Sequence, residues 1–296
     1  MKEFNTIYQE LYQKYHDNLE TLRKEAFKKR IILFIILLLI CIIILFVNFT
    51  AFIFALFISI LISALVPFSN NYKKQYKDTL ITKLVSFYDP NLSFSQNSRI
   101  SRSTYNEAEF ERYDYFYSND LVSGKIDNEI LFEAGDVRTE YESTDSEGHT
   151  SRTIVFSGLF SSAKFNTNIK NTIKIRSDKG FLGKLLPANK QLIQLDSQEF
   201  EKLFDVYSTD KILAMRILTS DILDYMINFK KENKIKYELT LKNSSLYIRI
   251  HCKDMFEAPF SKDSLDFDTL HMYYKIIHFV CELNRKFYHT VEGKDI

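Results

Sequence analysis

The chain has 296 residues, and its 39 Lys and Arg against 38 Asp and Glu leave a net charge of only +1. This balance provides no basic excess to neutralise phosphates, so we expect no nucleic-acid partner. Hydrophobic residues make up 46% of the chain and only three residues are cysteines, which excludes a disordered chain and a disulfide-stapled miniprotein.

The first 30 residues carry apolar side chains every three or four positions, which predicts an amphipathic helix over residues 1–30. A similar pattern recurs at residues 71–88 and ends before Asp89-Pro90, because the residue before a proline avoids the helical region. We expect the two stretches to pack together as an antiparallel stalk. The alternative is that residues 1–30 lie flat on a membrane surface.

Between these stretches lies an apolar run in which 33 of the 38 residues 31–68 are hydrophobic. A spanning helix needs roughly 20 apolar residues, so the run is too long for one pass and nearly right for two. The polar cluster Asn48-Phe49-Thr50 divides it, which predicts a transmembrane hairpin with spans 31–47 and 51–68 and Pro67 at the exit. We interpret Cys41, Ser59 and Ser63 as lipid-facing or helix-packing residues, because no ionisable group accompanies them.

The orientation follows from the basic residues on both sides of the run. Arg23, Lys24, Lys28, Lys29, Arg30, Lys73, Lys74 and Lys77 flank the two spans, whereas the connecting loop carries no Lys or Arg. The positive-inside rule therefore predicts a multi-pass protein of the bacterial cytoplasmic membrane with both termini in the cytoplasm.

Residues 69–112 are expected to form a juxtamembrane helix followed by a Ser-rich connector at residues 91–104. From residue 113 to 296 the pattern predicts a cytoplasmic α+β domain, with a mostly antiparallel sheet and helices covering one face. Its first hairpin turns at Asp127-Asn128, its second pairs residues 137–141 with 153–165, and its third turns at Lys242-Asn243. Gly158 is expected to mark a bulge or a close backbone contact.

Two further strands and three helices complete the expected domain. The strands are residues 172–176 and 191–195, separated by a loop containing Gly180, Gly183 and Pro187. The helices are residues 211–218, a helix starting at Thr219-Ser220-Asp221, and residues 267–288.

The sequence predicts no catalytic residue, no cofactor-binding residue and no metal ligand. Cys41, Cys252 and Cys281 lack the paired spacing of a zinc site, and we interpret each as a buried thiol. His271 and His278 would share one helix face, yet a packed or surface histidine is a simpler interpretation than a metal site. His149 lies in an acidic loop that offers no support for metal binding.

Two further groups of residues resemble parts of functional sites but do not support one by their spacing. Glu129, Glu133 and Asp136 are candidates for a convergent acidic site, but their spacing cannot show convergence. Gly180-Phe181-Leu182-Gly183-Lys184 lacks the spacing of a phosphate loop. The stretch around these glycines is basic. We interpret it as a solvated loop, and the alternative is a contact with anionic headgroups or a partner. Its basic residues are Lys170, Lys174, Arg176, Lys179 and Lys184.

Several segments resemble a bacterial family known as the domain of unknown function 3137 family. They are residues 121–126 (LVSGKI), 156–160 (FSGLF), 164–166 (KFN), 199–210 (EFEKLFDVYSTD) and 214–219 (AMRILT). The resemblance implies an uncharacterised two-span membrane protein and implies no activity. At Asn119-Asp120 the chain departs from a Gly-containing acidic turn of the family, which leaves the geometry of that turn open.

The leading hypothesis is a non-enzymatic membrane protein that presents a cytoplasmic α+β binding or scaffold module at the inner leaflet. Its expected partners are the lipid bilayer and an unidentified protein or small ligand. The alternative is a membrane-anchored enzyme that acts on a lipid or envelope precursor through dispersed acidic and His residues. Self-association through the stalk is a third hypothesis.

Overall fold

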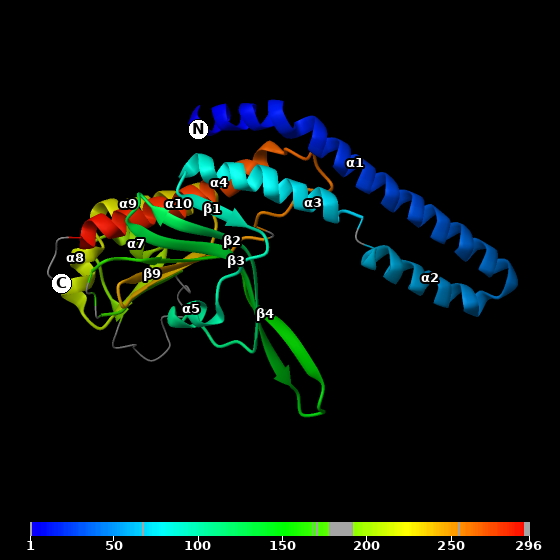
Figure 1. Cartoon of the computed structure of the whole chain (residues 1–296). Helices are drawn as coiled ribbons and strands as arrows, with labels where there is room; N and C mark the ends of the chain where they lie inside the picture. Colours follow the sequence, from blue (N-terminus) through cyan, green and yellow to red (C-terminus); the bar gives the residue numbers. More distant parts are fainter. Residues whose placement is uncertain are drawn as a thin grey trace. The chain divides into compact units, whose positions relative to one another are not determined.

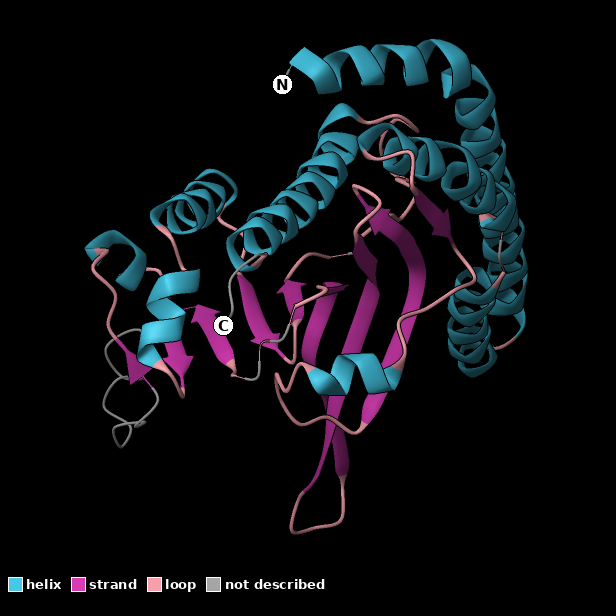
Figure 2. Ribbon diagram, turned by 60° about the vertical axis from the view of Figure 1, so that its left-hand side comes forward, coloured by secondary structure: helices cyan, strands magenta, loops and turns pink. Residues whose placement is uncertain are grey.

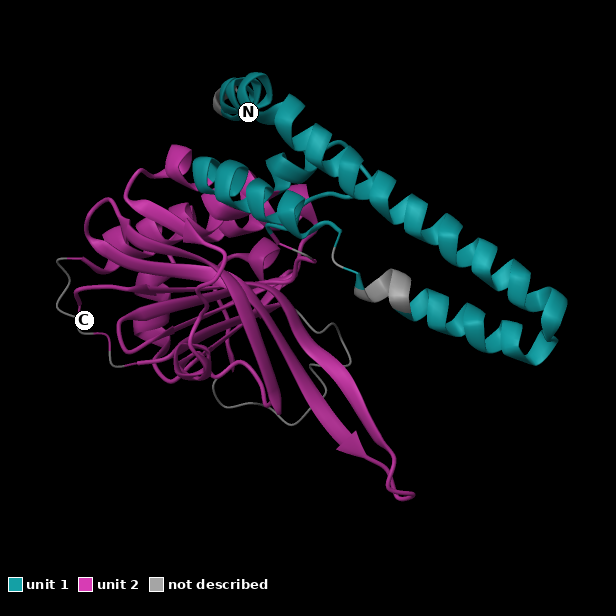
Figure 3. Ribbon diagram, turned by 45° about the vertical axis from the view of Figure 1, so that its right-hand side comes forward, with its two compact units in different colours: residues 1–84, 256–272 teal, residues 85–255, 273–296 magenta. Residues whose placement is uncertain are grey.

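The structure is a computed structural model that describes residues 2–66, 68–167, 169, 171–177, 192–253 and 255–292, without the side chains of residues 2, 3 and 62–65. The chain divides into two compact units (Figure 3). The helical unit consists of Met1–Leu84 and Phe256–Met272, and the sheet unit consists of Val85–Met255 and Tyr273–Ile296. The fold is α+β, with a long N-terminal helix and a large antiparallel sheet, as the sequence predicts.

The helical unit is built from α1 (Lys2–Val47), α2 (Phe49–Leu65), α3 (Asn70–Tyr76) and a π-helical turn, η1 (Lys77–Ile81). The amphipathic stretch and the first apolar stretch form one continuous helix, because no Pro or Gly separates them. Asn48 ends α1, and its side-chain oxygen accepts hydrogen bonds from the amides of Thr50 at 2.9 Å and Ala51 at 3.3 Å. The polar cluster is therefore a helix boundary, and α2 runs back along α1 (Figure 1).

Among the described residues, one helix is long and apolar enough to cross a membrane, and this is α1. The apolar stretch of α2 is shorter, covering Phe49–Leu61. Both helices expose large hydrophobic side chains, including Ile43, Phe46 and Phe57. Pro67, the expected exit of the second span, lies outside the described residues.

The N-terminal part of α1 packs on two partners. It contacts α3 and η1, as the pairing of the two amphipathic stretches predicts. The second partner is the segment Phe256–Met272, which the sequence does not indicate. The Tyr8 hydroxyl donates to the carbonyl of Leu265 at 2.9 Å, and the Tyr72 hydroxyl donates to that of Pro259 at 2.8 Å. Residues remote in sequence thus complete the helical unit.

The sheet unit contains nine described strands in the order β1-β2-β3-β4-β9-β8-β5-β7-β6, and neighbouring strands are antiparallel. They are β1 (Leu92–Ser95), β2 (Tyr115–Ile126), β3 (Ile130–Thr144), β4 (Thr150–Lys164), β5 (Ile173–Ser177), β6 (Leu192–Ile193), β7 (Phe204–Ser208), β8 (Tyr237–Lys242) and β9 (Ser245–Ile250). Gly180, Gly183 and Pro187 of the loop before β6 lie outside the described residues.

The three predicted hairpins are confirmed. Asp127 and Asn128 have left-handed φ angles of 52° and 63°, and they join β2 to β3. The third turn lies one residue later than predicted, at Asn243 and Ser244. β3 is shared by the first two hairpins, and residues 141–144 pair with 150–153 beyond the last pair with β2, so they form a two-stranded arm (Figure 2).

Gly158 makes the close backbone contact expected from the sequence. A Cβ atom at this position would lie 2.0 Å from the carbonyl oxygen of Ile250, and the φ angle is +152°. The family-specific departure at Asn119-Asp120 is a β-bulge, because the register with β3 shifts between Asn119 and Val122 and Asp120 has a φ of 57°.

Helices pack on both faces of the sheet, which corrects the expectation that they cover one face. The helices are α4 (Thr82–Tyr88), α5 (Arg102–Glu107), α7 (Gln198–Glu201), α8 (Lys211–Ile217), α9 (Ser220–Asn233) and α10 (Phe267–Val291). Tyr237 of β8 contacts Phe229 of α9 and Phe279 of α10. Tyr105 of α5 packs on Phe160 of β4, and Phe160 shares its face with its strand partner Arg249. Arg249 pairs in turn with Glu238, the neighbour of Tyr237 on β8, so α5 covers the face opposite to that of α9 and α10.

The connector expected at residues 91–104 is also corrected, because it contains β1 and the start of α5. β1 pairs with β2 at the sheet edge, and Ser101 caps α5 by accepting a hydrogen bond from the amide of Thr104. A strand of four residues is too short to leave a periodic signal in a Ser-rich sequence. β7 was likewise not predicted.

Candidate functional site

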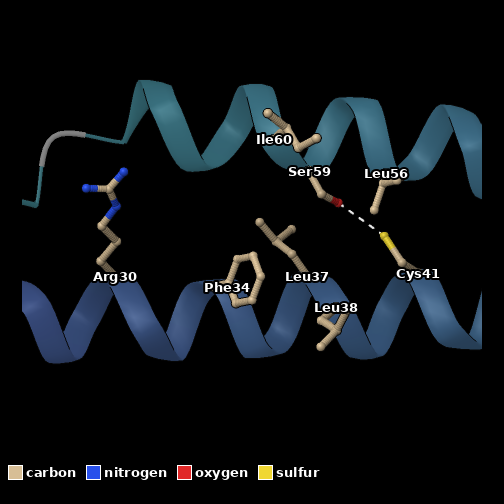
Figure 4. A pocket seen from close by; sticks show the side chains of 8 residues that line it. All are labelled: Arg30, Phe34, Leu37, Leu38, Cys41, Leu56, Ser59 and Ile60. Carbon is tan, nitrogen blue, oxygen red and sulfur yellow. Dashed lines mark hydrogen bonds between the residues drawn. The ribbon is translucent and has the colours of Figure 1, made fainter.

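An apolar groove separates the facing sides of α1 and α2 (Figure 4). Its volume is about 310 Å³, and its lining residues are Arg30, Phe34, Leu37, Leu38, Cys41, Leu56, Ser59 and Ile60. The α1 residues recur with helical spacing, so they share one face of that helix. The Cys41 sulfur lies 3.3 Å from the Ser59 hydroxyl, which brings the two helices close at one end of the groove.

Arg30 is the charged residue of the groove and directly precedes the apolar run. Its guanidinium lies 5.9 Å from the ring centroid of Phe260, and it forms no ion pair within the described part of the chain. The groove therefore combines a hydrocarbon wall with a cation at one end.

The other polar cluster of the helical unit consists of His16, Glu20 and Asp263, whose ligand atoms lie within 4.8 Å of one another. Neighbouring groups of the protein already bind these side chains. Arg23 donates to both carboxylate oxygens of Glu20, at 2.6 and 2.9 Å, and this contact lowers the pKa of Glu20 to about 2 against the effect of burial. Asp263 accepts a hydrogen bond from the His16 ring at 3.0 Å.

The ligand atoms of this cluster are already engaged by neighbouring groups of the protein, which argues against a metal. Burial alone would lower the pKa of His16, but hydrogen bonds with Asp263 and Asp17 raise it above its usual value of 6.5. The cluster is therefore an ion-pair network that holds the segment Phe256–Met272 against α1, together with the amide of Ser264, which donates to Glu20 at 3.1 Å.

A second ion pair attaches the same segment to the π-helical turn. The buried Lys77 ammonium lies 2.5 Å from Glu257, and Lys73 lies 3.4 Å from the same carboxylate. Burial by itself raises the pKa of Glu257, but these two lysines outweigh it and hold the pKa below its usual value. Glu257 therefore stays charged near neutral pH.

The sheet unit has a polar cleft of about 550 Å³ beside α5. It is lined by Arg102, Asn106, Glu111, Arg112, Tyr113, Asp114 and Tyr141. Arg102 donates to the carbonyl of Asp114 at 3.2 Å and lies 5.1 Å from the ring centroid of Tyr113. Arg112 is exposed and has no ion pair among the residues described.

The carboxylates of this cleft already have partners. The amide of Glu142 donates to Asp114 at 2.7 Å, and Glu111 accepts hydrogen bonds from the Tyr105 hydroxyl at 2.9 Å and from Arg249. The two guanidinium groups therefore face the cleft without a carboxylate of their own. This arrangement suits an anionic ligand.

A pair of carboxylates lies elsewhere on the α5 face. Glu133 of β3 is half-buried, and both burial and the neighbouring charge of Glu107 raise its pKa. The Tyr247 hydroxyl donates to Glu107 at 2.7 Å. A carboxyl group with a raised pKa beside a second carboxylate is a recurring feature of acid–base sites.

The three acidic residues singled out from the sequence do not converge. Glu133 and Asp136 are three positions apart on β3, so their side chains lie on opposite faces of the sheet. Glu129 lies near the hydroxyl of Tyr288. Glu107 is the actual neighbour of Glu133, and its position on a separate short helix gave no sequence signal.

The burial of the cysteines and the packing of the histidines agree largely with the interpretation from the sequence. Cys41 and Cys281 are buried, and burial raises the pKa of the partly exposed Cys252 to about 12. His271 stacks on Phe4 at 4.8 Å between ring centroids, and His278 packs edge-on against Tyr88 at 5.5 Å. His149 lies at the exposed tip of the β3–β4 arm.

The basic stretch is only partly described. Lys174 pairs with Glu109 at 3.0 Å, and the half-buried Arg176 donates to Thr240 at 3.1 Å, so both cations have partners within the chain. Lys170, Lys179, Lys184 and the Gly180–Gly183 loop lie outside the described residues, and so does the side chain of Ser63.

Three comparisons relate the chain to known proteins. A family model described as "Protein of unknown function (DUF3137)" matches residues 154–288, so the resemblance expected from the sequence is confirmed over this range, which does not include residues 121–126 or the two apolar helices. No curated protein matches the sequence.

Among solved structures, the crystal structure of the mycobacterial trehalose monomycolate transport factor A, TtfA, is similar with a TM-score of 0.33 and 10% identity. The similarity covers 72% of this chain and 94% of that chain. A similarity of this extent carries no argument about fold or function.

Proposed function

We propose that this chain, which resembles the DUF3137 family over residues 154–288, is a two-span membrane protein that presents its sheet unit as a binding module at the cytoplasmic surface. The observation that carries the proposal is the exposed apolar surface shared by α1 and α2. Phe46 is 87% exposed and Phe54 is 71% exposed, although both are large hydrophobic residues. Side chains of this kind are stable in lipid and unstable in water.

The lengths of the two helices support a hairpin of short spans. Residues 31–47 and α2 each have 17 residues and extend for about 25 Å, against a hydrocarbon core of about 30 Å. Flanking residues and local thinning of the bilayer accommodate a difference of this size. Asn48 satisfies backbone amides at the start of α2 with its own side chain, so the turn suits the opposite headgroup region.

The proposed topology places residues 1–30, 69–112 and 113–296 in the cytoplasm and only the turn at Asn48 on the outside. The basic flanks support this orientation, because Lys and Arg stay on the cytoplasmic side. The sheet unit would then bind a protein, lipid or small anionic ligand through the cleft that contains Arg102 and Arg112.

The topology can be tested by labelling single introduced cysteines with a membrane-impermeant maleimide. Phe49→Cys should be labelled in intact cells, whereas Gly148→Cys, at the open tip of the β3–β4 arm, should be labelled only after permeabilisation. The wild-type protein gives the background from its own cysteines. Labelling of Gly148→Cys in intact cells, or complete extraction of the protein by alkaline carbonate, would contradict the proposal.

A second candidate function is an enzyme acting on a lipid or envelope precursor. The specific observation in its favour is Glu133, whose pKa is raised beside Glu107. Membranes containing the wild-type protein, but not Glu133→Gln, should then convert a component of a bacterial envelope extract, as followed by mass spectrometry. Identical product profiles would count against the enzyme.

Self-association through residues 1–30 has less support. Phe4, Leu11 and Leu19 of that stretch are buried within the same chain. The apolar face that was expected to drive self-association is therefore already buried within the chain. The mass of the full-length protein in detergent, with and without residues 1–30, tests this hypothesis.

A further inference from the structure

We infer that the groove between α1 and α2 binds one acyl chain of an anionic phospholipid, with the phosphate held by Arg30. The inference rests on the proposed insertion of both helices into the membrane. It adds a defined lipid site to an otherwise general membrane anchor.

The shape of the groove supports a chain-like ligand. Phe34, Leu37 and Leu38 form one wall, and Leu56 and Ile60 form the other (Figure 4). These five side chains present carbon atoms only, so the volume of about 310 Å³ offers water hydrogen-bonding partners only at its two ends, at Arg30 and at Cys41 and Ser59. In a membrane, hydrocarbon is the medium that fills such a space.

The length of the groove matches one leaflet. From Arg30 to Cys41 the helix advances by 11 residues, or about 16 Å at 1.5 Å per residue. Half of a hydrocarbon core of about 30 Å is about 15 Å. The contact between Cys41 and Ser59 therefore closes the groove near the depth at which an acyl chain of the same leaflet ends.

Charge determines which lipid is favoured. Arg30 lies at the boundary between the basic residues and the apolar run, which is the level of a phosphate group in the adjacent leaflet. Its guanidinium has no carboxylate partner in the described part of the chain, and a guanidinium binds phosphate oxygens in a bidentate manner. Lys28 and Lys29 add positive charge, so a lipid with net negative charge is preferred over a zwitterionic one.

Two pairs of variants separate this site from general lipid contact. Arg30→Gln removes the groove cation, whereas Lys29→Gln removes an exposed cation next to it that does not line the groove. Leu38→Trp fills the groove, whereas Leu39→Trp places the same side chain on an exposed position outside it. Lys29→Gln removes the same charge as Arg30→Gln, and Leu39→Trp makes the same replacement as Leu38→Trp.

The experiment measures lipid retained by the full-length protein, using native mass spectrometry from nanodiscs that contain equal amounts of phosphatidylglycerol and phosphatidylcholine. We expect the wild type, Lys29→Gln and Leu39→Trp to retain one phosphatidylglycerol in preference to phosphatidylcholine. Arg30→Gln should reduce this preference by about tenfold, the size of one lost charged hydrogen bond. Leu38→Trp should abolish retention of both lipids.

The result that overturns the inference is equal retention by Arg30→Gln and Lys29→Gln, or by Leu38→Trp and Leu39→Trp. A dimer whose mass is lost only in Leu38→Trp would also overturn it, because the occupant would then be a second copy. Shielding of Phe54→Cys, an exposed position in the apolar run of α2, from a membrane-impermeant maleimide in the same nanodiscs reports insertion separately. Absence of insertion would refute the proposed topology, whereas insertion without selective retention would refute the lipid site alone.

Discussion

Arg249 on β9 lies directly opposite Glu238 on β8, and its Nε atom donates to the Glu238 carboxylate at 2.7 Å. Both residues are buried, with 7% and 5% of their surfaces exposed. The Arg249 guanidinium also lies 4.4 Å from the ring centroid of Phe110. A charged cross-strand pair is thus enclosed between the sheet and the segment that follows α5.

We predict that Arg249→Met destabilises the sheet unit by about 3 to 5 kcal/mol, because it leaves the buried Glu238 with only the exposed Lys236, at 3.6 Å, as a cation. Lys231→Met is the matched control. Lys231 and Glu199 are both more than half exposed in their pair, so removal of this cation should cost about 1 kcal/mol or less. Urea unfolding of the full-length protein in detergent, followed by far-ultraviolet circular dichroism, measures both. Equal effects would show that burial of the pair contributes little.

We predict that Gly158→Ala destabilises the protein by roughly 3 kcal/mol or more, because its Cβ would lie 2.0 Å from the Ile250 carbonyl oxygen. Gly148→Ala provides the comparison. A Cβ there has no neighbour within 4 Å, so only the strain of its φ angle of +85°, about 1 to 2 kcal/mol, should remain. The thermal unfolding midpoints distinguish the two, and similar midpoints would contradict the close contact.

The acid sensitivity of the sheet unit should depend on His251. Burial, reinforced by the cations of Lys236, Arg249 and Lys230, lowers the pKa of His251 to about 4. Since its unfolded value is about 6.5, His251 contributes stability above pH 6.5, and this contribution is lost as the pH falls to 4, by on the order of 3 kcal/mol. In His251→Gln, the unfolding midpoint should therefore change less between pH 6.5 and pH 4 than it does in the wild type. The exposed His149→Gln should leave the profile unchanged.

His16 should show the opposite pH dependence. Its pKa is raised above 6.5 by Asp263 and Asp17, so the protonated ring stabilises the fold below pH 6.5 and the contribution disappears as the pH rises through the folded value. Because Asp263 is exposed, the contribution is about 1 kcal/mol or less. His16→Gln should therefore lower the unfolding midpoint at pH 6, and its effect should shrink as the pH rises. An effect independent of pH would contradict this assignment.

The sequence predicted the features that depend on local chemistry. Asp127-Asn128 marks a turn because these residues tolerate left-handed φ angles, and Asp210 marks the start of α8 because its side chain caps the amide of Leu213. Asn48 was recognised as a break because it is polar within an apolar run. In each case a few adjacent residues carry the information.

The features that were not predicted depend on residues far apart in the chain. Asp263 contacts His16 across 247 positions, and Tyr247 contacts Glu107 across 140. Neither pair has a spacing that a periodic pattern can reveal. The cleft beside α5 was missed for the same reason, since Tyr141 and Arg102 come from different elements.

The position of Phe256–Met272 in the helical unit has a consequence for biosynthesis. The ribosome makes α1 first, but the segment that covers Phe4 and pairs with His16 emerges only after almost the whole sheet has been translated. At about 5 to 20 residues per second, this delay is roughly 10 to 50 seconds. During that interval Phe4 and His16 lack these partners, and a nascent chain released before residue 256 would keep that face of the N-terminal helix uncovered permanently.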